Sequence, residues 1–597
     1  MTSDFVAALP SELVIKIFAF LDPACLTRCT AVSRGTFYHT SPPFLPSSAS
    51  LGTPTDANFE MAGHRYQGWK SLIENDLIWH KVATEQLGLC PAAVEVQDLA
   101  TLPSLKRWSA SGHLANLTSF RQLCVRWQQV LYSWRGSFDP NEEQDVPHSS
   151  LRQSRSKIRK IQATSKFIQI VTRVGLRSAW YIKADPEEGV LIVIASGWGL
   201  YVLDIKTNQV LTQLSIEQVG AYEHLEGERG ILVINDTRTA HGDFDVWVHR
   251  RLVLNGGNGD IYQRRNTLRP SQCSYVSRFK WPVFCTMGVF GTAFFWDLSD
   301  PEQPRHLISI DISAFYYPLG LDFDDQHLFM AGESLGAVTV YDRATGQVKW
   351  SLAAHLRQAD AHSLIRSYKL DFSEFLEDAD QRSSPFELCE RQLLGKRHLN
   401  DKLDAAINRL GDATPGDDDD EYDRPEWVAI HPDEGTGALL VLGRTMLAII
   451  PDFASLTESN CRAPIMMIEY TGRRHYSPYA DSRMQRSLAV ADGRAFVVMD
   501  CPIVLDLAPQ RKAPLTPGSA PFRLSDDPDT PPPLRIFAGR NPFIESTDVD
   551  GARGCISAQM DAANLFAAIS TRAPVDSDGN FEGYTPFEIL HWRIDGA

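Results

Sequence analysis

The sequence lacks the short cysteine and histidine groupings that bind metal ions or carry redox chemistry. Its ten cysteines form no CxxC pair, and its 16 histidines form neither an HxH nor an HExxH grouping. Zinc sites and thioredoxin-like motifs depend on these spacings. We therefore predict no metal site, no cofactor and no catalytic residues. The free thiols lead us to expect a reducing compartment, either the cytoplasm or the nucleus or both.

Long apolar runs and surplus basic charge are also missing. No stretch approaches the roughly 18 consecutive apolar residues that cross a bilayer. The 58 Lys and Arg against 74 Asp and Glu give a net charge of -16, whereas phosphate backbones are bound by surplus Lys and Arg. We thus expect neither a membrane nor a nucleic acid as partner. One basic cluster is predicted to be a solvated linker, with a nuclear-import or polyphosphate patch as the alternative: Arg152, Arg155, Lys157, Arg159 and Lys160.

The composition is otherwise that of a folded protein with more than one domain. Hydrophobic residues make up 43% of the chain, and the mean hydropathy is -0.21. A chain of 597 residues exceeds the size at which a single core stops growing. We therefore expect at least two domains.

The first helix, LPSELVIKIFAFLDP at residues 9–23, is apolar on more than one face. One stripe at helical spacing consists of Leu13, Ile17, Phe20 and Leu21, while Val14, Ile15 and Phe18 fall on other faces. A surface helix needs only one such stripe. Asp4 stands where a secretory signal would carry basic residues, and Glu12 and Lys16 interrupt the apolar run, which argues against a signal peptide. The second apolar face is therefore expected to contact protein.

Two further helices are predicted around a long loop. Asp22-Pro23 ends the first helix and starts the second, because Asp is a good N-cap and Pro fits the first helical position. Residues 35–67 are rich in Ser, Pro, Thr and Gly and predict a disordered loop. A helical pattern returns at 68–88.

These three helices together resemble the F-box. The family pattern has Leu-Pro before its first helix, Leu-Asp-Pro after it, Val-Cys/Ser-Arg at the end of the second helix, and later tryptophans. It is matched here by Leu9, Pro10, Glu12, Phe18, Leu21, Asp22, Pro23, Leu26, Val32, Ser33, Arg34, Trp69 and Trp79. The departure is the insertion at about 35–67, which costs little because closure entropy rises slowly with loop length. The alternative is a generic helical hairpin.

The resemblance implies a partner surface on a small all-α domain at 1–90. F-box helices dock on a Skp-family adaptor and through it on a cullin. The residues that the resemblance places at or just behind this interface are Leu9, Pro10, Leu13, Phe18, Leu21, Leu26, Val32 and Trp79.

A helical linker is predicted at 91–160. Its clear element is an amphipathic helix at 114–135, ended by Gly136, with apolar residues at three- and four-residue intervals: Leu117, Phe120, Cys124, Trp127, Leu131 and Trp134. A coiled coil would need a longer repeat. We expect this helix to buttress the N-terminal helices.

From about residue 161 short β-rich runs recur. The best internal match joins VLDIKTNQV (202–210) to VYDRATGQV (340–348). Asn208 and Gly346 occupy the same place in the two copies, and both residue types tolerate the positive φ of a tight turn. We therefore predict that the two copies share one hairpin turn.

Weaker copies start at 246, 294, 447, 503 and 590, which makes seven units. The first four units lie about 45 residues apart, the length of a four-stranded propeller blade. The pattern resembles a WD-repeat β-propeller, with Trp296-Asp297 as its one literal Trp-Asp. The last unit lacks an outer strand, and KFIQIVT (166–172) is predicted to supply it and close the ring.

Two insertions are predicted within the propeller at 161–597. The first, at about 357–425, begins with a helical pattern and ends in the acidic run 417–423, which is expected to be a solvated loop or else a docking tail for a basic partner. The second, at about 508–534, is rich in proline. Three motif-like strings, SGWGLY (196–201), NGGNGD (255–260) and DSDGNFEG (576–583), lack the helix or ligand spacing of phosphate or calcium sites.

The expected architecture is multidomain: a small all-α F-box helical domain followed by an all-β propeller of about seven blades. The resemblance implies a non-catalytic substrate-recognition adaptor of a cullin-RING ubiquitin ligase of the SCF type, with an unknown protein substrate on the propeller. The alternatives are a WD-like interaction scaffold outside ubiquitination and a propeller enzyme.

Overall fold

The computed structural model describes the chain from residue 76 onward, with gaps. The described residues are 76–101, 117–134, 137–138, 159–161, 164–173, 179–195, 199–219, 224–236, 239, 242–252, 261–312, 318–332, 337–356, 364–370, 388–391, 393–395, 427–443, 446–456, 464–470, 487–498, 502–511, 521–525, 527, 530–539, 555–561, 564–570 and 584–594. The chain divides into two compact units, Met1–Tyr132 with Lys512–Pro514, and Ser133–Arg511 with Leu515–Ala597. Each unit is described separately.

The described part of the first unit is helical. It contains α4 (Asp76–Lys81), a π-helical turn (Val82–Gln86), a 3-10 helix (Val96–Thr101) and most of α6 (Phe120–Trp134). The helix predicted at 114–135 therefore exists but begins later. Its apolar stripe is buried as expected, except that Leu117, ahead of the helix, is half-buried. No helix among the described residues is long and apolar enough to span a bilayer.

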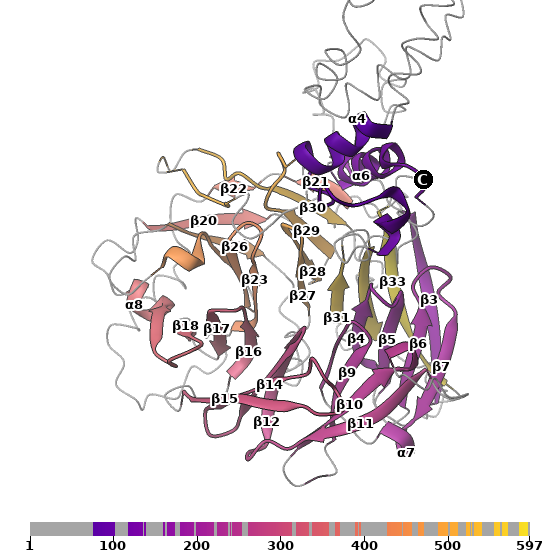
Figure 1. Cartoon of the computed structure of the whole chain (residues 1–597). Coiled ribbons are helices and arrows are strands. Elements are labelled where there is room, and N and C mark those ends of the chain that lie inside the picture. Colours follow the sequence, from indigo (N-terminus) through magenta and orange to yellow (C-terminus); the bar gives the residue numbers. More distant parts are fainter. Residues whose placement is uncertain are drawn as a thin grey trace, which may run out of the picture. The chain divides into compact units, whose positions relative to one another are not determined.

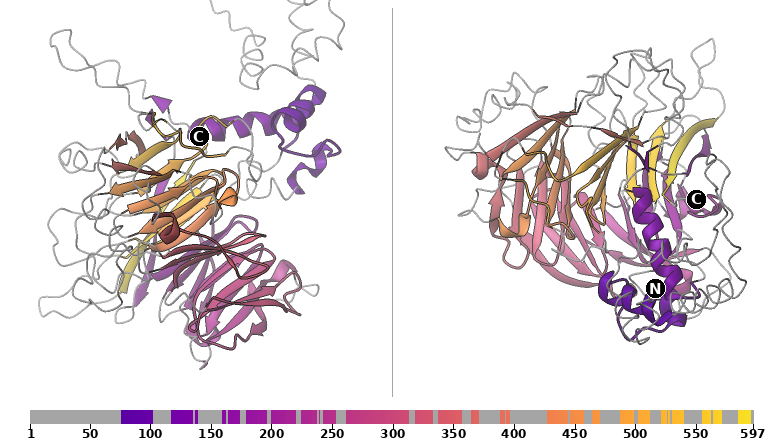
Figure 2. Two further views of the ribbon diagram at one scale, coloured as in Figure 1. Left: turned by 90° about the vertical axis from the view of Figure 1, so that its left-hand side faces the viewer. Right: turned by 90° about the horizontal axis from the view of Figure 1, so that it is seen from above.

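The second unit is a seven-bladed β-propeller (Figure 1). The described strands form seven sheets, and within each blade consecutive strands pair antiparallel. Their innermost strands contact one another in a closed ring, because the last, β31, lies beside the first, β4. Figure 2 shows the same succession of sheets from two further sides. The predicted fold class is confirmed.

The blades have the following strands, from the innermost outward. Blade 1 has β4 (Ala179–Asp185), β5 (Val190–Ala195), β6 (Gly199–Asp204) and β7 (Val210–Ser215); blade 2 has β8 (Leu225–Glu228), β9 (Ile231–Asp236), β10 (Asp243–His249) and β11 (Tyr262–Leu268); blade 3 has β12 (Ser274–Lys280), β13 (Val283–Gly288), β14 (Thr292–Asp297) and β15 (Arg305–Asp311). Blade 4 has β16 (Pro318–Phe323), β17 (His327–Gly332), β18 (Val338–Asp342) and β19 (Val348–Ser351); blade 5 has β23 (Trp427–Asp433), β24 (Ala438–Gly443), β25 (Met446–Ile450) and β26 (Ile465–Tyr470). Blade 6 has β27 (Leu488–Ala491), β28 (Arg494–Val498), β29 (Pro502–Asp506) and β30 (Arg535–Gly539); blade 7 has β31 (Cys555–Met560), β32 (Asn564–Ser570), β33 (Tyr584–Arg593) and β3 (Thr164–Arg173). Short helices α7 (Ile216–Val219) and α8 (Leu352–Leu356) follow the outer strands of blades 1 and 4.

The ring closes through β3, as the sequence predicted. This strand pairs antiparallel with β33 over ten residues, from Thr164 opposite Arg593 to Arg173 opposite Tyr584. The N-terminal strand of the propeller is thus the outer strand of its last blade. Closure of this kind ties the first strand to the last unit and removes an open seam from the ring.

The predicted shared turn is also present in both copies. Asn208 has φ 59° and Gly346 has φ 70°. In each copy the Asp that ends the third strand accepts hydrogen bonds from the Thr three residues later, through its backbone N–H (2.6 Å at Asp204, 2.9 Å at Asp342) and its hydroxyl (2.9 Å in both). The Asp-x-x-Thr pattern therefore encodes the turn locally.

The outer strands differ between two groups of blades. In blades 1 to 4 the pairing of the third and fourth strands contains a β-bulge, and the outer-strand residues skipped are Leu211, Arg265, Leu307 and Lys349. In blades 5 and 6 the same pairing runs without a shift. These regular outer strands each carry further strands at their edge.

The further strands come from the first insertion and from the linker. β20 (Ile365–Leu370) adds parallel to β26, β21 (Leu388–Arg391) adds antiparallel to β30, and β22 (Leu394–Gly395) pairs with β20. The helical pattern predicted in this insertion is wrong at 388–391 and 394–395, because pairing with a blade edge overrides the local preference. Outside β21, β2 (Arg159–Lys160) and β1 (Ser137–Phe138) complete the sheet, although a helical linker was expected there. The acidic run 417–423 lies outside the described residues.

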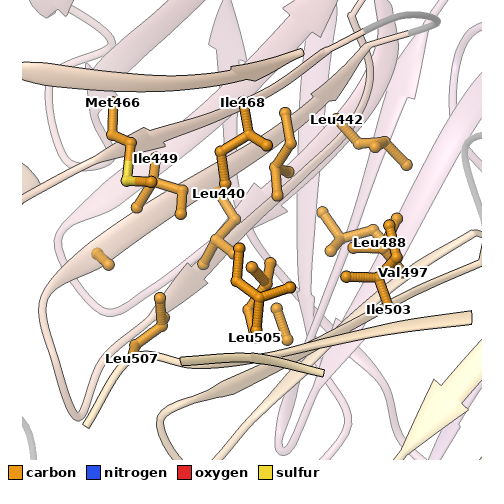
Figure 3. Packing of buried hydrophobic residues seen from close by; sticks show 14 of the residues in the cluster. Leu440, Leu442, Ile449, Met466, Ile468, Leu488, Val497, Ile503, Leu505 and Leu507 are labelled. Carbon is orange, nitrogen blue, oxygen red and sulfur yellow. The ribbon is translucent and has the colours of Figure 1, made fainter. Parts of the chain in front are cut away.

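The core lies between neighbouring blades. Figure 3 shows the cluster at the junction of blades 5 and 6, where Leu440, Ile449 and Ile468 of blade 5 face Val497 and Leu505 of blade 6. Phe522, from the proline-rich insertion at 508–534, is also buried in this cluster. The described part of this insertion around Phe522 therefore packs on the propeller.

Candidate functional site

The central channel of the propeller holds a polar cavity of about 60 Å³. Each of the seven innermost strands contributes at least one lining residue. A buried water needs roughly 10–15 Å³ by this measure, and small-molecule pockets are far larger, about 300–1,000 Å³. The cavity therefore fits a few waters or the tip of an inserted side chain, and it is too small for a cofactor.

Two linked groups of charged side chains cross the channel wall. In the first, Lys183 Nζ of blade 1 lies 2.8 Å from Glu226 Oε2 of blade 2, and the hydroxyl of Tyr181 donates to Glu226 Oε1 at 3.2 Å. The strands of blades 1 and 2 supply these residues at the same level of the channel. Glu226 is 5% exposed, so its charge depends on these partners.

The second group centres on Asp322 of blade 4, which is 1% exposed. Its carboxylate lies 2.9 Å from Lys280 Nζ and 3.4 Å from Arg278 Nε, both on blade 3. On its other side it lies 2.7 Å from His431 Nδ1 of blade 5. One carboxylate thus connects three consecutive blades.

Charge states in this group follow from burial and from these partners. Burial alone would raise the pKa of Asp322, but Arg278, Lys280 and His431 outweigh it and hold that pKa well below its usual range. Burial and the neighbouring Arg278 lower the pKa of His431. At neutral pH the group therefore contains an ionised Asp322, a cationic Arg278 and a neutral His431.

Arg278 is the residue best placed to meet a ligand. Its side chain lines the cavity, and its Nε has no hydrogen-bond partner among the described residues. Burial lowers the pKa of Arg278, but Asp322 and Glu226 outweigh it and raise that pKa above its usual range. A charged guanidinium that lines a polar cavity suits a carboxylate or another oxygen-rich side chain of a bound protein.

Carboxylates at the ends of inner strands hold the blades together beside the channel. Asp185 of blade 1 accepts a hydrogen bond from Gly230 N of blade 2 at 2.6 Å, and Asp433 of blade 5 accepts one from Gly493 N of blade 6 at 3.0 Å. Both donors lie in two-residue turns in which both residues have positive φ, Arg229-Gly230 and Asp492-Gly493. Burial raises the pKa of Asp185 to about 6.

The described residues show no arrangement suited to catalysis by a metal. No group of three or more His, Cys, Asp or Glu side chains among them could hold a metal ion. What the channel offers among those residues is binding chemistry, with a positive donor beside a polar cavity.

Most of the predicted partner-binding residues lie outside the described part of the chain. This applies to Leu9, Pro10, Leu13, Phe18, Leu21, Leu26 and Val32, which all precede residue 76. Trp79 is described: it lies in α4, is fully buried, and its carbonyl oxygen lies 3.7 Å from Cys124 Sγ of α6. Its side chain thus supports the helical unit from within, and a role in docking stays a prediction.

Sequence reasoning missed the channel residues. Arg278, Asp322 and His431 come from three inner strands that are far apart in the chain. The only local signal was a charged residue within an otherwise β-rich run, as in SRFK at 277–280. Such residues are also common on solvated faces, so the pattern was not specific.

Comparison with protein families finds a match for the N-terminal residues. Residues 6–38 match the F-box-like family model. The chain carries an F-box-like segment. The match covers Leu9 through Arg34 of the residues that carry the resemblance in the sequence, and it leaves out Trp69 and Trp79.

Solved structures similar to the chain have low identity. A chain of the mitotic checkpoint complex is 9% identical, with 76% of this chain and 97% of that chain covered and a TM-score of 0.36. The β-propeller domain of Cps50 (Swd1) from Myceliophteria thermophila is 10% identical, with 71% and 99% covered and a TM-score of 0.33. Hsv2 from Kluyvelomyces marxianus is 9% identical, with 55% and 80% covered and a TM-score of 0.30. No curated protein matches the chain. The propeller assignment rests on the chain's own sheet topology.

An F-box-like segment joined to a propeller is the composition of a protein-interaction adaptor. The F-box-like segment implies a Skp-like binding partner, and the propeller implies a second protein partner.

Proposed function

We propose that this chain is the substrate-receptor subunit of a cullin-RING ubiquitin ligase of the SCF type. The single observation that carries the proposal is the F-box-like match at 6–38 on the same chain as a closed seven-bladed propeller. In this role the protein catalyses no bond chemistry. It raises the effective concentration of substrate lysines near activated ubiquitin by binding both sides at once.

The docking end of this proposal is the N-terminal segment. Pro10 and the apolar side chains near it would bind the Skp-family adaptor, and a cullin would bind through that adaptor. Interfaces of this kind depend on a few buried apolar residues, so truncation of one or two of them removes most of the affinity. Location in the cytoplasm or nucleus is part of the same proposal.

The substrate end is the propeller, and we assign the channel mouth at Arg278 to it. Arg278 carries a permanent charge and lines the cavity, and its Nε is held 3.4 Å from the carboxylate of Asp322. A substrate that inserts an acidic or amide side chain there would replace the waters that the cavity accommodates.

The docking end is tested by capture of the tagged full chain from cells. The double variant Pro10→Ala, Leu13→Ala should lose the Skp-family protein and the cullin together, by at least tenfold in quantitative mass spectrometry. The matched control is Leu211→Ala, which truncates an apolar side chain that is 47% exposed on the propeller, and it should retain both proteins. If the double variant retains both, the protein is a scaffold that docks by another surface.

The substrate end is tested by Arg278→Gln in the same capture, with the proteasome inhibited. This variant should keep the Skp-family protein and lose a set of other captured proteins. The control is Arg264→Gln on outer strand β11, where the arginine pairs with Asp245 at 2.8 Å away from the channel. Equal capture by both variants would contradict the assignment of the channel.

A further inference from the structure

The first insertion crosses the outer edges of two blades. It runs as β20 along blade 5, as β21 along blade 6, and as β22 back to β20. Only Gln392 and Leu393 separate β21 from β22, so the chain passes directly from one blade edge to the next. Leu393 is partly buried against the cluster between these blades, which is shown in Figure 3. The described strands of the insertion are therefore packed onto the propeller.

The linker is attached to the propeller through β21. Lys160 of β2 lies opposite Cys389 of β21, and Ile161 N donates to Leu388 O at 2.9 Å. Ile161 and Leu388 are both buried, at 6% and 1% exposed. β1 then pairs with β2. In the described residues, the sheet of blade 6 reaches the linker only by way of β21.

A second contact holds the same part of the chain on blade 6. The guanidinium carbon of Arg494 lies 4.3 Å from the ring centre of Trp134, and both residues belong to the propeller unit. Arg494 is 2% exposed, and Asp492, 3.3 Å away, balances its charge. A cation over a tryptophan ring is attracted more strongly when it is desolvated than when it is exposed.

We infer that these two contacts form an anchor on blade 6. The anchor restrains the chain between α6 and the propeller, and this restraint limits which of the chain's own lysines receive ubiquitin. The anchor consists of the Trp134–Arg494 contact and the pairing of β2 with β21. The second half of the inference rests on the proposed function. Released from blade 6, residues 135–163 would act as a flexible linker with an end-to-end distance of roughly 30 Å. An anchored chain presents fewer of its lysines to the ubiquitin-carrying enzyme, because fewer arrangements of the chain bring a lysine and the enzyme together.

The structural half is tested first, by an engineered disulfide. Lys160→Cys places a thiol opposite the natural Cys389, and opposed residues of antiparallel strands meet the distance that a disulfide needs. Mild oxidation should join residues 160 and 389, as shown by mass spectrometry of peptides. Arg159→Cys is the matched control, because Arg159 lies opposite Phe138 and not Cys389. Cross-linking in the control alone, or in neither protein, would overturn the anchor.

The restraint itself is tested with Cys389→Pro, Trp134→Ala and both together in the full chain. Amide hydrogen exchange at 137–138 and 159–161 should become at least tenfold faster in Cys389→Pro. The control Leu307→Pro alters a bulge residue of blade 3 that has no register partner, and it should leave exchange at these residues unchanged. Unchanged exchange in Cys389→Pro would contradict the anchor.

The functional half is tested by mapping ubiquitin on the chain's own lysines in a reaction reconstituted with the Skp-family protein, cullin, RING subunit and ubiquitin-carrying enzyme. The double variant should show at least twofold more modified lysines than the unaltered chain, with equal capture of the Skp-family protein. An identical set of lysines would overturn this half. If the unaltered chain fails to bind the Skp-family protein, the proposed function fails, while the disulfide and exchange results still decide the anchor.

Discussion

Blades 1 to 4 and blades 5 and 6 leave their outer edges in two different states. The first group has a β-bulge in every outer strand and carries no added strand among the described residues. The second group has regular outer strands, and each of them pairs with a strand from the insertion at 357–425. An unpaired edge is a template for unwanted pairing, and both a bulge and a covering strand protect it. One chain therefore uses both solutions, and of the two covered edges that of blade 6 also holds the linker. Blade 7 has a regular outer strand, β3, with no added strand among the described residues.

Two of the six exposed large apolar residues of the described propeller lie at these bulges. Leu211 and Leu307, at 47% and 40% exposed, are two of the four bulge residues. A bulge turns its extra residue away from the regular pattern of the strand, which accounts for apolar side chains at exposed positions. Their exposure is therefore a consequence of edge protection and does not need a partner to explain it.

The largest effect is expected where a covering strand is buried. Leu388 of β21 is 1% exposed, so Leu388→Ala should lower the free energy of unfolding by about 2–4 kcal/mol through the cavity left behind. Leu307→Ala, at a bare edge, should change it by no more than about 0.5 kcal/mol. Urea denaturation of both variants measures the difference. Equal costs would show that β21 adds no stability to blade 6.

A smaller effect is expected at the carboxylates that join blades in both groups. Burial raises the pKa of Asp185 in blade 1 to about 6, above its ordinary value of about 3.9. The ionised form is therefore disfavoured in the folded state, and the contribution of Asp185 to stability rises as the pH falls from about 7 to 4. In Asp185→Asn the amide oxygen still accepts the hydrogen bond from Gly230 N, but the side chain no longer titrates. The variant should therefore lack this pH dependence of stability.

The measurement for Asp185 is the free energy of unfolding between pH 4 and 8 for both proteins. The neutral variant should be the more stable protein at pH 8, where the unaltered chain carries an ionised buried carboxylate, and this advantage should shrink by about 3 kcal/mol as the pH falls through 6 to 4. A difference that is constant over this range would mean that the folded-state pKa is ordinary. The control is Asp204→Asn, at a hairpin turn that is partly exposed.

A third effect is expected at the turn shared by blades 1 and 4. A Cβ on Gly346 would lie 2.6 Å from Ile310 Cγ2, and φ at this position is +70°. Gly346→Ala should therefore cost about 1–2 kcal/mol. Asn208→Gly, at the equivalent position in blade 1, should change stability by only a few tenths of a kcal/mol. Thermal unfolding of the two variants tests whether the turns are as alike in energy as in hydrogen bonding.

The smallest effect on stability is expected from removing a bulge. Deleting Leu307 would make β15 a regular strand with a bare edge, like the strands of blades 5 and 6 without their cover. Stability should change by less than about 1 kcal/mol, while self-association should increase, because regular edges pair with one another. Sedimentation velocity over a range of protein concentrations measures the self-association, with Leu307→Ala as the control. A deletion variant that stays monomeric would show that the bulge has no protective role.

Features with a local cause were predictable in this chain. The Asp-x-x-Thr turns at 204–208 and 342–346 carry their hydrogen-bonding partners within five residues, and all seven repeat units fell on the third strands of the blades. The closing strand was predictable as well, because a ring with one strand missing leaves an apolar N-terminal strand only one place to pair.

Apart from the closing strand, features that join distant segments were not predictable. β21 pairs with strands that lie more than 100 residues away on either side of it in the sequence, and a short segment contains no sign of such a partner. The same applies to the channel, where Asp322 receives cations and a histidine from two other blades. The helical pattern expected at 388–391 shows how a blade edge can override local preference.

Turn chemistry and the alternation of short strands specified the number of blades, because each turn and each strand pattern depends on residues close together in the chain. The closing strand followed from the count of strands, although it pairs with a strand more than 400 residues away in the sequence. Which edges are covered, where the linker is anchored and which side chains meet in the channel depended on the folded ring. Those contacts form only after loops of tens to hundreds of residues have closed, and their energies come from burial and from charges that the local sequence does not contain.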